Sequence, residues 1–406
     1  MNPFLGEARA IGDEMQTLRR DFHHHPELGM QEFRTARIIS EYLKESGLEV
    51  KTGVGGTGVV GTLYGQNSGK TVALRADMDA LPMQDKKTVP YASGTQGVAH
   101  SCGHDANTAI LMGAAKLLGR NADRLNGNVK FIFQPSEDTI PGGALPMIRD
   151  GALESPTVDY LFGLHLAPRF PEGKIVVKSG YSTIAGSGFE LKMIGKGGHI
   201  SRPQYNIDPI LMAGMVIMAA QTIVSRRIDP LEPTILAFAS VHGGTANNII
   251  PDEVTLTGSI RSLKPEARRE LAALLEKTAQ GIAQSIGGRC EMELELHYPS
   301  VFNHPVLVPS FLESAASVAG PDRVEQTPYP NMGGEDISYF LQRVPGVYWW
   351  LGTGSAEKGY THPLHSSLFD FNEKAVMPLG AAVHAQVAVD CLNRPMAAPL
   401  DIQVDA

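Results

Sequence analysis

The segment Val72-Ala73-Leu74-Arg75-Ala76-Asp77-Met78-Asp79 joins a short apolar run to two carboxylates. A continuous apolar run of this kind is typical of a strand that is buried on both faces. Similar runs occupy residues 129–133, 160–164 and 346–351. Residues 33–46 and 108–118 show helical spacing of apolar side chains and are each followed by a glycine stop signal. Strands that alternate with helices predict an α/β domain, with a mostly parallel sheet and helices on both faces.

The pattern changes near residue 187. Phe189, Leu191 and Met193 alternate with polar or small neighbours, as in a strand with one buried face. The following segments read as a helix, two strands, a helix and a last strand: residues 208–226, 235–241, 254–260, 265–286 and 291–296. This order predicts an α+β domain of βαββαβ (ferredoxin-like) type. We therefore predict a catalytic domain in two pieces, residues 1–186 and 299–406, with an inserted domain at 187–298.

The composition indicates a globular protein. The chain has 406 residues, of which 43% are hydrophobic, and a net charge of −8, which argues against nucleic acid or an anionic membrane as partner. Three cysteines do not make a disulfide framework, and the first residues show no secretory signal, so we expect a cytoplasmic location. The longest apolar run, residues 210–220, is too short to span a bilayer and is expected to be a buried helix.

Two conspicuous motifs are interpreted as structural. Gly53-Val54-Gly55-Gly56-Thr57-Gly58 fits a dinucleotide fingerprint, but the residues that follow it alternate like a strand and not like a helix. We interpret it as a tight turn between strands, which disfavours nicotinamide binding. His23-His24-His25-Pro26 is interpreted as the end of a helix before a proline and not as a metal-binding tract.

Residues that can bind a metal or transfer a proton lie where the predicted strands end. Ligands of open parallel sheets bind beyond the carboxyl ends of the strands. These positions hold a thiol, imidazoles and carboxylates: Asp77, Asp79, Cys102, His104, Glu137, Asp138, His165 and His365. Thiolate and imidazole suit zinc, and carboxylates suit zinc or manganese, so we predict two adjacent divalent ions. Of the neighbouring acids Glu137 and Asp138, one can bind a metal while the other stays free as a base.

Eight segments occur in the order found in the dinuclear metallo-amidohydrolases and carboxypeptidases of the aminoacylase type. They are Arg75-Ala76-Asp77-Met78-Asp79-Ala80-Leu81-Pro82, Cys102-Gly103-His104-Asp105, Gln134-Pro135-Ser136-Glu137-Asp138 with Gly142-Gly143-Ala144, Gly163-Leu164-His165, Gly195-Lys196-Gly197-Gly198-His199, Asn248-Ile249-Ile250-Pro251, Met332-Gly333-Gly334-Glu335-Asp336 and Leu364-His365-Ser366. The chain most resembles the subfamily of hippurate hydrolase, N-acyl-L-amino-acid amidohydrolase and indole-acetyl-amino-acid hydrolase. The resemblance extends over roughly residues 15–395.

The resemblance implies a role for each candidate site residue. Glu137 is the general base that activates water, and Asp77 orients a histidine ligand from outside the ligand set. In the inserted domain, His199 helps to hold the oxyanion, while Asn248 and Arg261 bind substrate. The inserted domain acts as a lid and pairs subunits, which implies a homodimer or a dimer of dimers. The implied metal ligands are Cys102 (bridging, as thiolate), His104, Asp138, His165 and His365.

The implied activity is metal-dependent cleavage of N-acetyl, N-benzoyl or aryl-acyl amino acids to a carboxylic acid and a free amino acid. A short peptide is the alternative substrate, which would make the chain a dipeptidase or carboxypeptidase. An aryl-amide hydrolase is a further alternative. Two departures from the family pattern, Asp138 in place of the usual glutamate and Asn107 in place of a histidine, motivate a last alternative. It is a metal-poor homologue that binds a small molecule.

Overall fold

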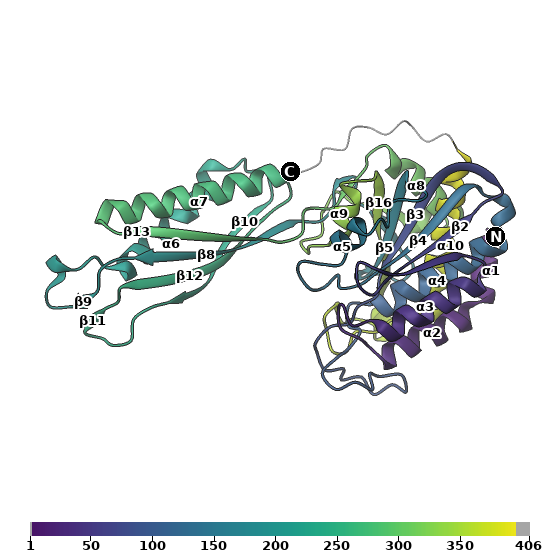
Figure 1. Cartoon of the computed structure of the whole chain (residues 1–406), viewed down its shortest axis with the longest axis horizontal. Coiled ribbons are helices and arrows are strands. Elements are labelled where there is room, and N and C mark those ends of the chain that lie inside the picture. The colour runs from purple at the N-terminus through teal and green to yellow at the C-terminus, as the bar shows by residue number, and fades with distance from the viewer. Residues whose placement is uncertain (1, 395–406) are drawn as a thin grey trace. The chain divides into compact units, whose positions relative to one another are not determined.

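A mixed sheet of eight strands lies at the centre of the first part of the computed structural model, which describes residues 2–394 (Figure 1). Its strand order is β1-β2-β4-β3-β5-β16-β6-β15, and β3, β4, β5 and β16 run parallel in its middle. This confirms the predicted, mostly parallel sheet. The strands are β1 (Glu49–Val54), β2 (Gly58–Tyr64), β3 (Asn67–Asp77), β4 (Asn126–Gln134), β5 (Tyr160–Pro171), β6 (Ile175–Val177), β15 (Val324–Gln326) and β16 (Gly346–Gly354).

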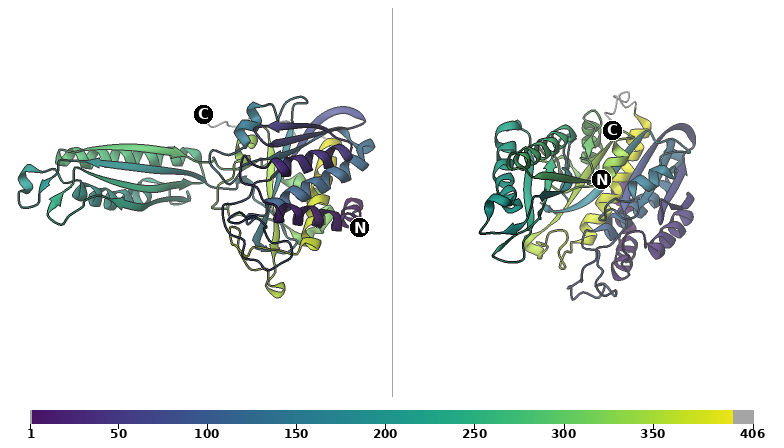
Figure 2. Two further views of the ribbon diagram at one scale, coloured as in Figure 1. Left: turned by 60° about the horizontal axis from the view of Figure 1, so that its bottom comes forward. Right: turned by 60° about the vertical axis from the view of Figure 1, so that its left-hand side comes forward.

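Helices cover both faces of this sheet (Figure 2). Successive residues of β3 point to opposite faces: Val72 and Leu74 enter one hydrophobic cluster, and Ala73 enters the other. A strand that is buried on both sides needs apolar residues at every position, which explains the continuous apolar run. The helices are α1 (Pro3–Ala10), α2 (Gly12–His24), α3 (Phe33–Glu45), α4 (His104–Arg120), α8 (Leu307–Ala319) and α10 (Glu373–Asn393) on one face, and α5 (Ala144–Arg149) and α9 (Ile337–Leu341) on the other.

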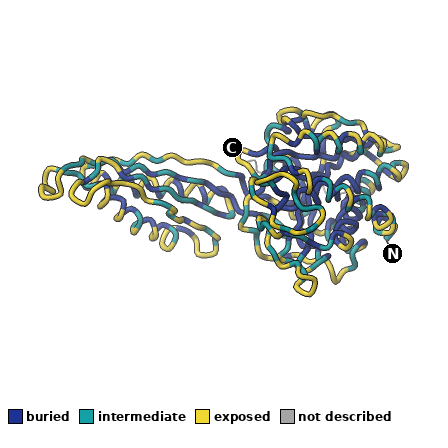
Figure 3. Tube along the Cα trace, turned by 90° about the horizontal axis from the view of Figure 1, so that it is seen from below, coloured by how far each residue is buried: buried dark blue, intermediate teal, exposed yellow. Residues whose placement is uncertain are grey.

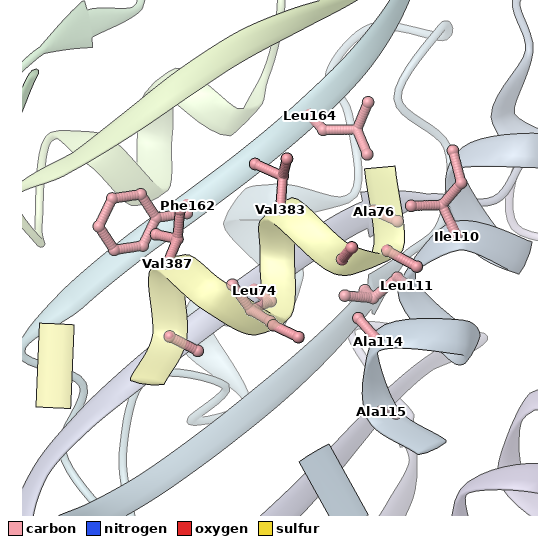
Figure 4. Close-up of a cluster of buried hydrophobic side chains, with 14 of the residues drawn as sticks. Leu74, Ala76, Ile110, Leu111, Ala114, Ala115, Phe162, Leu164, Val383 and Val387 are labelled. Atoms are coloured by element: carbon pink, nitrogen blue, oxygen red, sulfur yellow. The ribbon is translucent and has the colours of Figure 1, made fainter. Parts of the chain in front are cut away.

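Helix α10 packs across the sheet in the larger cluster. Figure 4 shows Val383 and Val387 of α10 beside Leu74 and Phe162 of the sheet, and Ile110 of α4 nearby. The strands in this region are buried and the connecting loops are more exposed (Figure 3). The parallel strands therefore have a rigid support, and their carboxyl ends are held in fixed positions.

His384 of α10 makes this core sensitive to acid. Neither ring nitrogen has a hydrogen-bond partner among the described residues, and the ring lies against Trp349. Burial lowers the pKa of His384 to about 3, whereas an unfolded histidine binds a proton below about pH 6.5. The stability that depends on the neutral ring is therefore present above pH 6.5 and is lost as the pH falls towards 3.

Replacing this histidine should remove part of the acid sensitivity. Between pH 7 and pH 5, the free energy of unfolding of the wild type should fall by about 2 kcal/mol more than that of His384→Leu. Urea unfolding with a chelator present, so that metal release does not contribute, measures both. Parallel pH dependences of the two proteins would show that His384 is not the group responsible.

The second unit comprises Thr183–Ser300 with Pro330–Gly334, and the first unit comprises the other described residues. The predicted insertion at 187–298 lies inside the second unit. The short segment Pro330–Gly334 is an addition that we did not predict. It joins this unit because Thr183 forms a parallel β-bridge with Asn331, and the Ile184 amide donates to the Gly333 carbonyl.

Four antiparallel strands and two helices form the second unit, which confirms the βαββαβ prediction. The strand order is β10-β12-β8-β13, and the helices pack on the sheet through a separate hydrophobic cluster. Its elements are β8 (Ala185–Ile194), α6 (Pro209–Arg227), β10 (Thr234–His242), β12 (Glu253–Ser262), α7 (Pro265–Ile286) and β13 (Arg289–Leu296). A pair of two-residue strands, β9 (Gly198–His199) and β11 (Ile249–Ile250), also belongs to this unit. A similar pair, β7 (Gly180–Tyr181) and β14 (Phe302–Asn303), belongs to the first unit.

Helix α6 is not the buried helix that we expected. Met212 and Val216 are buried, but Met218 is 74% exposed, and Ile210 and Leu211 are about half exposed. By length and composition alone, α6 and α10 are both apolar enough to cross a membrane; α10 is mostly buried and α6 only 33% buried. The apolar run belongs to a helix that packs one face on its sheet and leaves a second apolar face uncovered in the single chain.

Candidate metal centre

The loops that follow the parallel strands supply the site. Strand β3 ends at Asp77, β4 ends three residues before Glu137, and His165 lies within β5. Cys102 and His104 flank Gly103, which adopts φ +90° just before α4 begins. A Cβ at this glycine would lie 3.3 Å from Leu166, and the positive φ itself disfavours other residues. The glycine thus allows a tight turn that has the thiol of Cys102 on one side and the imidazole of His104 on the other.

Two sets of candidate ligands share one thiol. Cys102, His104 and His165 form one set, and Cys102, Asp138 and His365 form the other, with the ligand atoms of each set within 4.8 Å of one another. Cys102 Sγ is 3.5 Å from His165 Nε2 and 3.3 Å from His365 Nε2. One sulfur between two sets is the arrangement that two neighbouring cations with a bridging thiolate require. The structure therefore brings all five predicted ligands together.

Two of the histidines are held by their outer ring nitrogens. His104 Nδ1 is 3.0 Å from the backbone oxygen of Asp79 and 3.1 Å from its carboxylate. His165 Nδ1 is 2.8 Å from the Leu166 carbonyl oxygen. A hydrogen bond at Nδ1 leaves Nε2 free to bind a metal and fixes the orientation of the ring. Sequence reasoning did not assign this role to Asp79.

The position of Asp77 differs from the one we predicted for it. Its Oδ1 is 3.7 Å from His104 Nε2, the ring nitrogen that faces the ligand sets. An orienting residue would instead contact the other ring nitrogen, Nδ1. The same Asp77 oxygen accepts a hydrogen bond from Asn107, and Oδ2 accepts one from Arg75. The contact that orients His104 is made by Asp79 because that residue lies in the turn after β3 has ended.

The residues present fit a pair of divalent cations. His104 Nε2 and Asp138 Oδ2 are buried and have no hydrogen-bond partner among the described residues. Burial raises the pKa of the Cys102 thiol well above its ordinary value, and the Asp138 carboxylate raises it further. A divalent cation offsets both costs, because it binds lone pairs that would otherwise stay unpaired and stabilises a thiolate. The mixture of sulfur, nitrogen and oxygen ligands is one that zinc accepts.

The aspartate at position 138 still reaches the second ligand set. Its Oδ1 is 3.4 Å from His365 Nε2, and its amide donates to Asp79. Burial opposes ionisation of Asp138, but the hydrogen bond with His365 and the nearby His104 lower its pKa overall. The shorter side chain therefore does not remove a carboxylate from the site. Asn107, the second departure, supports Asp77 through its side-chain amide.

Glu137 is a buried carboxylate beside the ligand sets. Its Oε2 is 3.9 Å from His104 Nε2, and the side chain is nearly inaccessible to solvent. Burial raises the pKa of Glu137 well above its ordinary value, and the negative charge of Glu335 reinforces this. A carboxylate with a raised proton affinity next to a metal site is suited to take a proton from water.

Arg75 and Glu335 belong to the same charged cluster and were not among our predicted site residues. The Arg75 guanidinium pairs with Asp77, Glu335 and Asp336, and all four groups are buried. The hydroxyl of Tyr348 donates to Glu335 at 2.7 Å. The available signal in the sequence was the arginine itself, because a charged residue inside an apolar strand must have buried partners.

The remaining predicted residues lie in the second unit. His199 is exposed on β9, and its Nδ1 accepts hydrogen bonds from the Ser201 amide at 3.2 Å and hydroxyl at 2.8 Å. The Asn248 carbonyl accepts from the amide of Ile200. Arg261 lies on β12 and donates to the Met332 carbonyl. The predicted roles of His199, Asn248 and Arg261 stay predictions.

Known proteins resemble the chain over nearly its whole length. The model of "Peptidase family M20/M25/M40" matches residues 73–390. A thermostable carboxypeptidase of Saccharolobus solfataricus is 39% identical over 96% of this chain and 98% of its own. A hippurate hydrolase of Campylobacter jejuni is 36% identical over 96% and 99%.

A solved structure agrees with these sequence matches. The YXEP protein of Bacillus subtilis, described as a dinuclear metal binding peptidase, has a TM-score of 0.81 and 32% identity over 94% of this chain and 99% of its own. The predicted resemblance, fold class and enzyme class are thereby confirmed. The chain belongs to the M20/M25/M40 peptidase family and is a metal-dependent hydrolase.

Proposed function

We propose that the protein cleaves the amide bond of N-acyl amino acids to give a carboxylic acid and a free amino acid. The observation that carries the proposal is the shared Cys102 between two ligand sets, with the buried Glu137 beside them. The similarity to a hippurate hydrolase supports an N-acyl amino acid as the substrate class, since hippurate is N-benzoylglycine. Within this class we propose N-acetyl, N-benzoyl or aryl-acyl amino acids.

Two divalent ions, zinc or manganese, would be held by the two ligand sets, and when bound they would lower the pKa of water and polarise the substrate carbonyl. His104 and His165 would bind the first ion, and Asp138 and His365 the second, with Cys102 common to both. The sulfur and imidazole content favours zinc. The YXEP protein, described as dinuclear, supports the number of ions.

The proton transfers fall to Glu137. It accepts a proton from the attacking water and returns it to the nitrogen of the leaving amine, which must depart as a neutral group. Its burial keeps the proton affinity high enough for both steps. Arg75 balances the negative charge of the neighbouring carboxylates, so that Glu137 can ionise at all.

Three residues of the second unit complete the proposal. The Ser201 amide can only donate, so His199 Nδ1 is the acceptor and a neutral ring carries its proton on Nε2. His199 Nε2–H is then suited to donate to the carbonyl oxygen of the substrate. We assign substrate binding to Asn248 and Arg261, with Arg261 pairing with the carboxylate. The support for these roles is the family resemblance.

A second copy of this chain is the proposed partner. Helix α6 has an uncovered apolar face that includes Leu211, Met215 and Met218, and it packs against β10, which is an edge strand. A symmetric dimer covers such a face and the neighbouring strand edge together. Light scattering should give about twice the mass of one chain, or four times for a dimer of dimers; a monomer would contradict this.

The three free cysteines support a cytoplasmic location, which is the location we propose.

A panel of substrates tests the proposed activity. N-acetyl and N-benzoyl amino acids should be hydrolysed, a chelator should abolish the activity, and added zinc or manganese should restore it. Dipeptides belong in the panel, because the similarity to a carboxypeptidase favours a peptidase as the second candidate. Faster cleavage of dipeptides than of every N-acyl amino acid would replace the first proposal with the second. Binding without turnover of any compound would indicate a binding protein.

A further inference from the structure

Glu32 links two loops of the first unit from a fully buried position. Its Oε1 accepts a hydrogen bond from the Ser136 amide at 2.9 Å, and its Oε2 accepts one from the Thr57 hydroxyl at 2.5 Å. The side chain of Glu32 is 0% exposed. Burial raises its pKa to about 7. Neither Glu32 nor Thr57 belongs to the ligand sets, so their burial needs another explanation.

Ser136 is the residue directly before Glu137, and its backbone is strained. It adopts φ +53°, a conformation that residues with a side chain rarely take. The segment before Glu32 lies close to this turn: a Cβ at Gly29 would lie 2.6 Å from Ser136 Oγ, so there is no room for a side chain at position 29. A strained turn persists only where the surroundings hold it in place. The buried carboxylate of Glu32 supplies one such hold.

The Gly-rich turn between β1 and β2 places Thr57. The Gly55 amide donates to Asp150 at 2.7 Å, and a Cβ at Gly55 would lie 2.5 Å from the Met147 nitrogen of α5. A Cβ at Gly58 would lie 2.3 Å from the Val54 carbonyl oxygen of the same turn and 2.8 Å from Met147 Cε of α5. The glycines are therefore required for close packing on α5. This packing sets Thr57, itself 5% exposed, against Glu32.

We propose that Glu32, held by Thr57, is a positioning residue that fixes the Ser136 turn and so places the Glu137 carboxylate for proton transfer. The proposal rests on the function proposed above for Glu137. A misplacement of a catalytic group by about 1 Å can cost a factor of about 10² in rate. The Gly-rich motif, which the sequence analysis interprets as a tight turn, thereby has a role in catalysis at a distance from the reacting atoms.

The test compares two substitutions of Glu32. Glu32→Met keeps the length but removes the acceptor, and we expect kcat to fall about 10²-fold with KM and metal content unchanged. Glu32→Gln keeps an acceptor for the Ser136 amide and a partner for the Thr57 hydroxyl. It should therefore retain kcat within about threefold of the wild type.

Glu27→Met is the matched control. Glu27 is also a glutamate of this segment, but it accepts from the amides of Arg34 and Thr35 at the start of α3. Its loss should lower stability, as the loss of a helix cap does, without lowering kcat. A general loss of stability would therefore affect Glu27→Met as much as Glu32→Met, whereas a positioning role affects only the latter.

Hydrogen exchange gives a readout that does not depend on activity. The Ser136 amide should exchange faster in Glu32→Met and in Thr57→Val than in the wild type, and at the wild-type rate in Glu27→Met. Unchanged kcat or unchanged Ser136 exchange in Glu32→Met would overturn the proposal; if that variant does not fold, Thr57→Val decides in the same way. A wild type without hydrolase activity would refute the proposed function, while the exchange data would still test the hold on Ser136.

Discussion

Glu137→Gln is expected to lower kcat by about 10²- to 10⁴-fold, which is the usual contribution of a general base. Glutamine has the same shape but cannot accept and return a proton, and the five predicted ligands are left intact. KM and the metal content should therefore stay close to the wild-type values. Steady-state kinetics on the best substrate of the panel and elemental analysis of the same sample measure all three quantities.

Glu313→Gln is a suitable control for this experiment. Glu313 lies on α8, its side chain is exposed, and its contact is an ion pair with Arg394. It should leave kcat unchanged, since exposed ion pairs contribute little. Near-normal turnover in Glu137→Gln with both metals present would remove Glu137 from the mechanism.

Cys102→Ala is expected to weaken both metal sites at once. Cys102 is the one residue that occurs in both ligand sets, so its loss takes a ligand from each. His365→Ala removes a ligand from one set only and should leave the other ion bound. Metal affinity should fall in Cys102→Ala by more than the roughly 10- to 100-fold that the loss of an outer hydrogen-bond partner costs. The measurement is the metal-to-chain ratio after dialysis against a weak chelator.

Cys290 offers a matched control within the same chain. It is a half-buried, free cysteine of the second unit and lies outside both ligand sets. Cys290→Ala should keep the wild-type metal content and activity. A Cys102→Ala protein that retains both ions would show that the thiol does not bridge them, and equal losses in Cys102→Ala and Cys290→Ala would indicate a general effect on folding.

The sequence predicts those elements in which the pattern of apolar residues directly reflects which faces are buried. Strands β3, β4, β5 and β16 are buried on both faces and appear as continuous apolar runs, and the second unit shows regular alternation. Helix α10 was not predicted, because it is apolar on nearly all sides and has no polar face to give a periodic pattern. Helix α2 was predicted only at its end, where the histidine tract precedes Pro26, and the structure confirms that end. The rest of α2 was missed for the opposite reason: it buries Arg19 and His23, charged or polar residues that indicate a surface.

The sequence predicts the ligands of the site better than their supports. Cys102, His104 and His165 are recognisable because thiol and imidazole groups recur at strand ends and loops. The choice between Asp77 and Asp79 as the partner of a histidine depends on the turn after β3, which no periodicity describes. Glu32 is in contact with a residue more than one hundred positions away, and only the fold brings the two together.

The uncovered face of α6 shows a further limit of sequence patterns. The residues of this helix are apolar on more than one side, which is typical of a helix buried within one chain. The structure leaves Met218 and Leu211 exposed. An apolar run does not distinguish a helix buried in the core of one chain from a helix buried at an interface, because both remove apolar surface from water.

The central proposal is that one sulfur, Cys102 Sγ, would bind both metal ions of this chain. Anomalous diffraction from crystals of the zinc-loaded protein locates the ions directly. We expect two peaks, each at about 2.3 Å from Cys102 Sγ, with His104 and His165 on one ion and Asp138 and His365 on the other. A single peak, or two peaks of which one lies beyond bonding distance of Cys102, would contradict the account.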